Sequence, residues 1–409
     1  MFDIRQYPFD EKHSCLDVAG EAMIFHCHHY LNYLLRSILD ADYIDSRPFL
    51  IGAAADSSYL QLSQLCKGLK PEEAKKMVAS VYKTFGYGLL DLTNMTEWGL
   101  SLNTVKSFFS KTWLMKFGHS KRPVDYYTSG FLAAAYAVIY KRPLREVHVE
   151  QTQCMSLGDP CNTHVVRPGP CNFSLYPAKN PTAFNPSLKQ SLDWEHEEFI
   201  TRAFLGAHEH MVGNEEGYIP AFGVYLTRCQ SDFVNRWQFE FMHALREVAG
   251  EYGEKLGTEL LLESGHACGF FTYGGVMASE EWNAVVKPLL HNREDWVRGL
   301  SALINAMGWG YHTATELSRE RAVFRNYNDF EDLSYMRMYG RSVQPVPTAT
   351  SGGYSGLMHL VYNTDLVHGV VIDTEEGFRQ LRRSKAKYKA RITQSIACGD
   401  DYLEVDISI

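Results

Sequence analysis

Two stretches of the chain repeat the same order of apolar and polar positions. Each opens with an aromatic-rich helical pattern, at residues 29–41 and 233–263, and continues with an amphipathic helix that ends at a Gly-aromatic-Gly turn. A strand pattern follows, and residues 315–326 show the alternation of a half-buried antiparallel strand. A helix of small residues and two strands around a Gly-Asp turn complete each stretch. This mixture predicts an α+β fold with two similar domains, each an antiparallel sheet packed with helices.

The two stretches also align residue by residue. Residues 85–140 fall on residues 307–362 without a gap, and the identical residues include both glycines of the Gly-aromatic-Gly turn and a Thr-Ser-Gly tripeptide. Thr-Gln pairs followed by Gly-Asp turns, at 152–159 and 393–400, then match at a longer spacing. Self-similarity at a fixed spacing is typical of repeated structural units, so the sequence predicts an internal duplication.

A proline-rich stretch separates the two copies. Clustered prolines are typical of a semi-extended connector rather than of a helix or a central strand. We therefore expect a first domain at residues 1–168, a linker at 169–190 and a second domain at 191–409. Similar domains commonly pair around a two-fold axis, and a tandem copy builds the same interface within one chain, so we expect a pseudo-dimer.

Bulk composition narrows the range of partners. The net charge of −8 gives no basic surface for nucleic acid. No apolar run reaches the roughly 18 residues that cross a bilayer, and the first residues lack the apolar core of a secretory signal. The odd number of cysteines, 9, is typical of reduced thiols. These features predict a cytoplasmic globular protein with neither nucleic acid nor membrane as a partner.

Several motifs occur together in the first copy. A Gly-aromatic-Gly turn precedes a small-residue helix that opens near Ser-Gly, and Cys154 and Cys161 flank a Gly-Asp-Pro turn. Together with the segment at 20–26, Gly-Glu-Ala-Met-Ile-Phe-His, they resemble the 4-vinyl reductase domain family. That family includes the aromatic-effector sensor domains of bacterial activators of phenol and toluene catabolism. The resemblance covers most of residues 20–166 and, more faintly, 222–407, and it implies a buried hydrophobic pocket for a small effector.

The resemblance also implies a structural zinc site beside that pocket. The matching residues are Glu150, Cys154 and Cys161, and thiolates suit a tetrahedral divalent ion. The chain departs from the family pattern, because Gln151 stands where the family has its glutamate and the two cysteines are one residue closer together. The second copy has Ser395 at the position of Cys154, so we expect zinc or another divalent transition metal in the first copy alone.

The segment Phe-His-Cys-His-His-Tyr at 25–30 concentrates side chains that bind metals or protons. In a helix His26 and His29 share one face, whereas in a strand His26 and His28 do. Two neutral imidazoles hold a transition metal or act as acid and base near neutral pH. The alternative is a helix start with partly exposed histidines and no chemical role.

A second cluster lies in the second copy. Residues 263–275 are rich in glycine and aromatic residues and follow a helical pattern, so we interpret them as a loop. This loop carries Glu263, His266 and Cys268. Loops on a rigid scaffold often carry function, so these side chains are expected to line a pocket.

The sequence therefore favours a protein that binds a small hydrophobic or aromatic molecule in a buried pocket. The residues expected to line the pocket are His26, His29, Tyr127, Trp309, His266 and Cys268. The alternative is a metal-dependent enzyme of small-molecule metabolism that uses the histidine cluster or residues 263–268. A sensor of this kind without an output domain would also need a protein partner.

Overall fold

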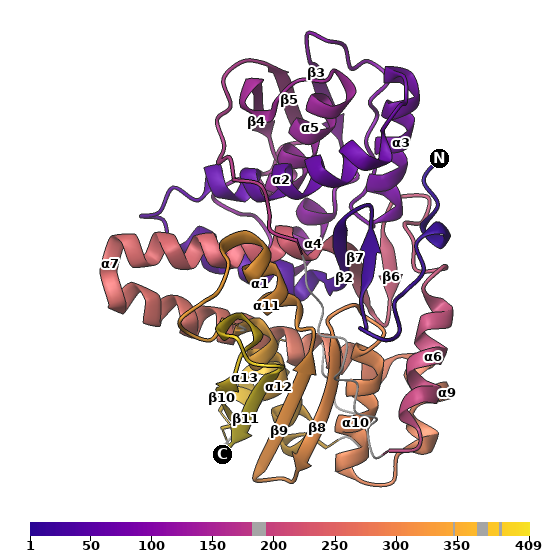
Figure 1. Ribbon diagram of the computed structural model, residues 1–409, viewed down its shortest axis with the longest axis vertical. Helices are drawn as coiled ribbons and strands as arrows, with labels where there is room; N and C mark the ends of the chain where they lie inside the picture. The colour runs from indigo at the N-terminus through magenta and orange to yellow at the C-terminus, as the bar shows by residue number, and fades with distance from the viewer. Residues whose placement is uncertain (182–193, 347, 366–374, 384–386) are drawn as a thin grey trace.

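The computed structural model describes residues 1–181, 194–346, 348–365, 375–383 and 387–409. Its architecture is α+β, as the sequence predicts: across these residues, three antiparallel sheets pack against helices. Figure 1 shows one sheet towards each end of the molecule and a third sheet between them. Over the same ranges, none of the helices combines the length and the apolar character needed to cross a bilayer.

The first half of the chain contributes five helices and five strands within the described residues. Their bounds are α1 His28–Asp40, α2 Arg47–Leu65, α3 Pro71–Thr84, α4 Phe108–Phe117, α5 Tyr126–Ile139, β1 Leu16–Val18, β2 Glu21–Cys27, β3 Leu100–Thr104, β4 Val147–Gln153 and β5 Asn162–Pro168. Strands β3, β5 and β4 form the sheet at this end, with β5 in the middle. Helix α5 is buried along almost its whole length, because it packs between this sheet and α2.

The second half contributes the remaining elements. Their bounds are α6 Glu197–Ala207, α7 Ser231–Cys268, a π-helical turn at Gly269–Tyr273, α8 Gly274–Ala278, α9 Glu280–Val285, α10 Arg293–Ile304, α11 Phe330–Tyr339, α12 Thr348–Asn363, α13 Glu375–Arg382, β6 Ile219–Ala221, β7 Val224–Gln230, β8 Tyr311–Leu317, β9 Arg321–Tyr327, β10 Lys389–Gln394 and β11 Leu403–Ser408. Strands β10, β11, β9 and β8 form the sheet at this end. Helix α12 lies on this sheet and packs along α7, much as α5 packs along α2.

The Gly-Asp turns of the two halves agree in detail. In the first turn the N–H of Cys154 donates to the Asp159 carboxylate over 2.8 Å, and in the second turn the N–H of Ser395 donates to the Asp400 carboxylate over 2.8 Å. The glycine in each turn has a left-handed backbone, with φ of 100° and 107°. The same local rules therefore build both turns, while the duplication of the chain stays a prediction.

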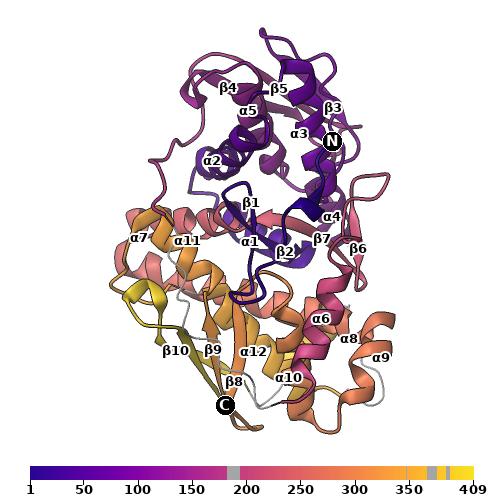
Figure 2. The ribbon, with the colours of Figure 1, turned by 45° about the vertical axis from the view of Figure 1, so that its right-hand side comes forward.

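The middle sheet joins the two halves. Strands β2 and β7 pair antiparallel, with Phe25 opposite Arg228. The N–H of Phe25 also donates to the carbonyl of Met307 over 3.0 Å, and that of Arg228 donates to the carbonyl of Phe85 over 2.9 Å. Met307 and Phe85 immediately precede the two Gly-aromatic-Gly turns. Each strand is thus held against the turn of the opposite half, and Figure 2 shows β2, α1 and β7 between the two end sheets.

The segment expected to form one strand at 315–326 is a hairpin instead. Strands β8 and β9 meet at a turn in which the N–H of Ser318 donates to the carbonyl of Arg321 over 2.8 Å. The turn contains neither glycine nor proline, so the polar alternation of the sequence runs through it without a break.

The helix expected at 233–263 is longer and is folded back on itself. Gly250 has a φ of +59° inside α7, a conformation that glycine adopts without strain and that reverses the chain. An ion pair of 3.7 Å between Arg246 and Glu254 bridges the two arms, which lie side by side in Figure 1. The second arm of α7 packs on α12 in the way that α2 packs on α5 in the first half.

The proline-rich connector crosses both halves before it leaves the described residues. The Lys179 ammonium lies 2.7 Å from the Glu21 carboxylate, 2.9 Å from that of Asp232 and 3.6 Å from that of Asp56. These carboxylates belong to β2, α7 and α2, so one half-buried cation of the connector contacts three elements. Residues 182–190 of the expected linker lie outside the described residues.

Candidate ligand-binding cavity

The histidine cluster at 25–30 spans the junction of a strand and a helix, so each sequence-based alternative describes part of it. Strand β2 ends at Cys27 and α1 begins at His28. His26 and His28 are both buried, and His28 accepts a hydrogen bond of 3.2 Å from the N–H of Tyr225. His29 is half-buried and stacks on an aromatic ring of the second half. Across the described residues no three His, Cys, Asp or Glu side chains gather as metal ligands, so this cluster gives no support to a metal-dependent enzyme.

The segment at 263–275 was expected to be a loop and is helical. It forms the last turns of α7 and the π-helical turn at Gly269–Tyr273. Its glycines serve close packing, because a Cβ at Gly265 would lie 2.4 Å from the carbonyl oxygen of Ala349 in α12. The His266 ring hydrogen-bonds His359 of α12 over 2.7 Å and does not line the cavity described next.

A small cavity of about 20 Å³, lined mostly by buried residues, lies between α7, α12, β8 and the start of α1. Its lining combines aromatic rings, small residues and a few polar groups. The lining residues are His26, Tyr30, Gly265, Cys268, Gly269, Tyr273, Trp309, His312, Phe330, Ala349, Thr350, Gly353 and Tyr354. His26, Cys268 and Trp309 of the sequence-based expectation therefore meet here, although they come from three distant parts of the chain.

Polar atoms without partners distinguish this cavity. Both ring nitrogens of His26, the hydroxyl of Tyr30 and Nε2 of His312 are buried and reach no hydrogen-bond partner within the described residues. Burial lowers the pKa of His26 and of His312 to about 3, so both rings are neutral and each keeps a donor and an acceptor. A buried polar group left unpaired costs about 1–3 kcal/mol. These unpaired groups therefore lower the stability of the folded chain.

Aromatic rings hold these polar groups in place. The His26 ring stacks on Tyr30, with ring centroids 4.4 Å apart, and its other face lies 5.0 Å from the Trp309 ring. Trp309 is fixed in turn by a hydrogen bond of 2.9 Å from its indole N–H to the carbonyl of Phe25. Nδ1 of His312 is bound to the Tyr354 hydroxyl over 2.6 Å, which leaves Nε2 as its free position.

The first half fills the corresponding space with side chains. Tyr127 aligns with Ala349 and Phe131 aligns with Gly353, so the first half carries two rings where the second has almost no side chain. The Tyr127 ring stacks on Tyr87 at 3.9 Å and is completely buried. Tyr127, which the sequence analysis assigned to a ligand pocket, therefore lies in the packed core of the first half.

Three acidic side chains lie buried beside the cavity. The Glu331 carboxylate accepts the N–H groups of Ala349 and Thr350 at the start of α12, over 3.1 and 2.7 Å. Burial is the largest cause that raises the pKa of Glu331 to about 7 and that of Asp332 to about 6. It also raises the pKa of Asp329 well above its usual range, with help from the two neighbouring carboxylates.

These shifts predict a stability that depends on pH. A carboxyl whose pKa is higher in the folded chain binds more protons there, so its stabilising effect is complete below about pH 4 and is lost as the pH rises through about 7. We expect the Glu331→Gln variant to lose less stability than the wild type between pH 5 and pH 8. Urea denaturation at both pH values measures this difference, and equal slopes for the two proteins would contradict it.

The residues expected to hold zinc do not converge. Glu150 is exposed on β4, whereas Cys154 is completely buried and its thiol lies 3.1 Å from the Ser156 hydroxyl. Cys161 is half-buried and contacts Gln153 over 3.7 Å. Since no three His, Cys, Asp or Glu side chains of the described residues gather as metal ligands, these three do not fit a tetrahedral zinc site.

The exchange of Cys154 for serine in the second half has a structural explanation. The Ser395 hydroxyl donates to the buried Asp332 carboxylate over 2.6 Å. The first half has Ser110 at the position of Asp332, and its hydroxyl lies 3.7 Å from the Cys154 sulfur. In the second half the Asp332 carboxylate therefore pairs with the Ser395 hydroxyl, and in the first half the Ser110 hydroxyl pairs with the Cys154 thiol.

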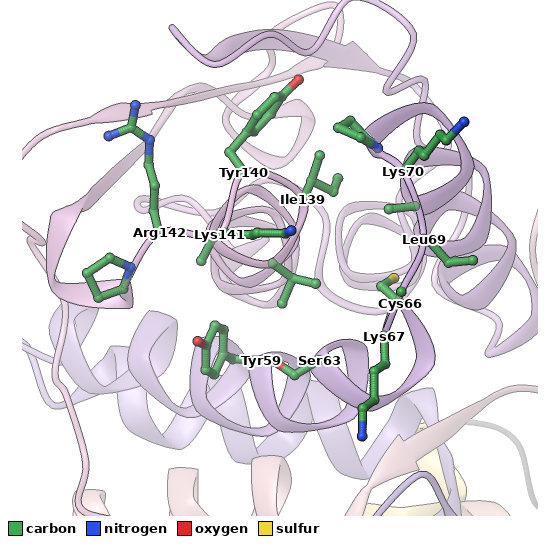
Figure 3. Close-up of a pocket in the computed structure, with 16 residues that line it drawn as sticks. Tyr59, Ser63, Cys66, Lys67, Leu69, Lys70, Ile139, Tyr140, Lys141 and Arg142 are labelled. Carbon is green, nitrogen blue, oxygen red and sulfur yellow. The ribbon is translucent and has the colours of Figure 1, made fainter.

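A second candidate site is a separate, open groove. It has a volume of about 860 Å³ and lies between the end of α5 and the connection from α2 to α3. Figure 3 shows Lys67, Lys70, Lys141 and Arg142 around it. None of the residues that the sequence analysis singled out lines this groove. We therefore place the candidate site in the small cavity beside His26.

Comparisons with known proteins add little to this picture. No family model matches the chain, and no curated protein matches it significantly. Among solved structures, the chain is similar to the crystal structure of the phenol-responsive sensory domain of the transcription activator PoxR with phenol. The sequence identity is 12%, the TM-score is 0.38, and the match covers 51% of this chain and 89% of that chain. Similarity at this level assigns no function to the chain.

Proposed function

We propose that the protein binds a small molecule with an apolar ring and one hydroxyl group in the cavity beside His26. The observation that carries this proposal is the set of unpartnered polar atoms of His26, Tyr30 and His312 in an otherwise aromatic cavity. Pockets for small molecules are mostly apolar, with a few polar groups that fix the orientation of the ligand. A hydroxyl would satisfy one of these atoms while its ring packs against Trp309 and Phe330.

The size of the cavity implies that its walls move when a ligand enters. Its 20 Å³ is enough for about one water molecule, so a ring needs additional space. One wall is the π-helical turn at Gly269–Tyr273, a rare geometry that is frequent at functional sites. Gly265 and Gly269 present no side chain on this wall. We therefore expect the turn to shift away from α12 when a ring is bound.

The change of His26 to phenylalanine separates ligand binding from stability. We expect His26→Phe to bind phenol at least about tenfold more weakly than the wild type, because the hydroxyl loses a hydrogen-bonding partner. We expect the same change to raise the free energy of unfolding by about 1 kcal/mol, because it removes two unpaired buried nitrogens and keeps a stacked ring. Isothermal titration calorimetry and urea denaturation measure the two effects.

His28→Phe is the matched control. His28 lies two residues away and is also buried, but it accepts the N–H of Tyr225 and does not line the cavity. This variant should therefore lose stability and keep its affinity for phenol. Benzene in place of phenol should bind the wild type and His26→Phe equally. An unchanged affinity of His26→Phe for phenol would disprove His26 as the partner of the hydroxyl.

We also propose that the chain arose by tandem duplication of a 4-vinyl-reductase-like domain, with residues 1–168 and 191–409 as the two copies. The shared order of elements and the matching Gly-Asp turns support this origin. On this proposal the second copy keeps the ligand site, and in the first copy the Tyr127 ring fills the corresponding space.

A further inference from the structure

Two thiols from opposite halves of the chain meet next to the cavity. Cys27 ends β2 and caps the first turn of α1, where its sulfur accepts the N–H of Tyr30 over 3.4 Å. Cys268 is the last residue of α7 and lines the cavity. Their sulfur atoms lie 3.8 Å apart. A disulfide has a sulfur–sulfur bond of about 2.05 Å, so the two atoms need to approach each other by about 1.8 Å.

The two thiols differ in their surroundings. Although burial opposes ionisation, hydrogen bonds from Cys268 and Thr272 and from the first N–H groups of α1 lower the pKa of Cys27 to about 7. The hydrogen bond to Cys27 and burial raise the pKa of Cys268 well above its usual range. A thiolate at a helix N-terminus beside a protonated thiol is the arrangement of a reactive cysteine and its resolving partner.

Access to this pair is narrow. The two cysteines are buried, with 2% and 6% of their surface exposed. The Thr272 hydroxyl lies 2.6 Å from the sulfur of Cys27 and 3.4 Å from that of Cys268, and Thr272 itself is half-buried. The Thr272 side chain therefore contacts both sulfurs and is itself partly exposed, so an oxidant as small as hydrogen peroxide suits this site better than a bulky disulfide.

We propose that hydrogen peroxide oxidises Cys27 and Cys268 to a disulfide that joins the two halves of the chain. The Cys27 thiolate attacks one oxygen of the peroxide, the O–O bond breaks, and a sulfenic acid and hydroxide form. The Cys268 sulfur then displaces the sulfenic oxygen, which leaves as water, and the S–S bond forms. The two thiols lose two electrons and two protons in all, and the peroxide is reduced to two molecules of water.

The disulfide would alter the wall of the cavity. Cys268 lines the cavity, and Cys27 lies next to His26, so drawing the sulfurs together moves side chains on two sides of it. Formation of the bond itself requires only the two thiols and peroxide. It is therefore independent of whether the cavity binds phenol.

Peptide mapping of the full chain tests the proposal. The protein is treated with stoichiometric hydrogen peroxide, its remaining thiols are alkylated under denaturing conditions, and the digest is analysed by mass spectrometry. We expect one peptide pair that contains Cys27 joined to Cys268, and its separation into single peptides on reduction. In Cys268→Ser we expect Cys27 to stop at the sulfenic acid and to be labelled by dimedone.

Cys229→Ser is the matched control, because Cys229 is buried on β7 and donates to the carbonyl of Gln230 rather than to a second thiol. This variant should form the Cys27–Cys268 disulfide at the wild-type rate. Cys27→Ser should leave Cys268 reduced. Oxidation of the half-buried Cys161 in the wild type, with Cys27 and Cys268 both recovered as free thiols, would overturn the proposal, as would a disulfide between other cysteines.

Discussion

Replacing Lys179 by methionine is expected to lower the free energy of unfolding by about 3–5 kcal/mol, the usual cost of removing one partner of a buried ion pair. The Lys179 ammonium lies within 3.6 Å of the carboxylates of Glu21, Asp56 and Asp232. Burial opposes the ionisation of Asp232, but the charges of Arg337 and Lys179 hold its pKa below the usual range. Without Lys179 the Glu21 carboxylate loses its ion pair at the point where β2, α2 and α7 meet, while Asp232 and Asp56 are left with Arg337 and Arg236 alone.

Urea denaturation of wild type and variant measures this loss. Lys76→Met is the matched control, because Lys76 is exposed on α3 and the same substitution there should change stability little. Adding Glu21→Gln to Lys179→Met should recover part of the stability, since it removes one of the uncompensated charges. If Lys179→Met were as stable as Lys76→Met, the connector would not hold the two halves in the way described.

The change of Tyr127 to alanine should open a cavity in the first half. Its ring stacks on Tyr87 at 3.9 Å and packs edge-on against Phe233 at 4.7 Å, and its hydroxyl donates to Gln230 over 3.2 Å. Deletion of a buried ring costs about 3–5 kcal/mol, because contacts are lost and the neighbours fill the space only in part. The variant then has alanine in the first half where the second half has Ala349.

A ligand should recover some of this loss. Dry cavities lined by apolar groups bind benzene, and a ligand that binds only the folded chain raises the midpoint of thermal unfolding. We expect benzene to raise the midpoint of Tyr127→Ala by more than that of the wild type. Tyr252→Ala serves as the control, because Tyr252 is exposed on α7 and its loss opens no cavity. An equal response of both variants to benzene would contradict the correspondence of the two sites.

Local patterns in the sequence were sufficient to predict most of the fold. The periods of the apolar positions located α1, α3, α5, α10 and α12, and the Gly-Asp turns located the terminal strands, because these signals depend on neighbouring residues. The hairpin of β8 and β9 was missed because its turn at Ser318 lacks glycine and proline. The segment at 263–275 was misread because its glycines serve the contact with α12, and a partner far along the chain leaves no local signal.

The candidate site could be predicted only in part. His26 and Cys268 stood out by residue type, but nothing in the sequence indicated that β2 reaches into the second half. Tyr30 and His312 were missed, since a tyrosine in a helix and a histidine in a strand have no distinctive pattern. The sequence aligns Tyr127 with Ala349, but it does not show that both positions are buried. Only the structure therefore reveals that the smaller residue leaves space for a cavity.

A crystal structure of the protein grown with saturating phenol tests the central claim most directly. We expect one phenol ring between α7 and α12, with its hydroxyl within about 3.2 Å of a nitrogen of His26 or His312 or of the Tyr30 hydroxyl. We also expect the π-helical turn at Gly269–Tyr273 to be displaced from α12. Phenol bound only in the open groove around Lys67 and Arg142, or a cavity unchanged at saturation, would contradict the account.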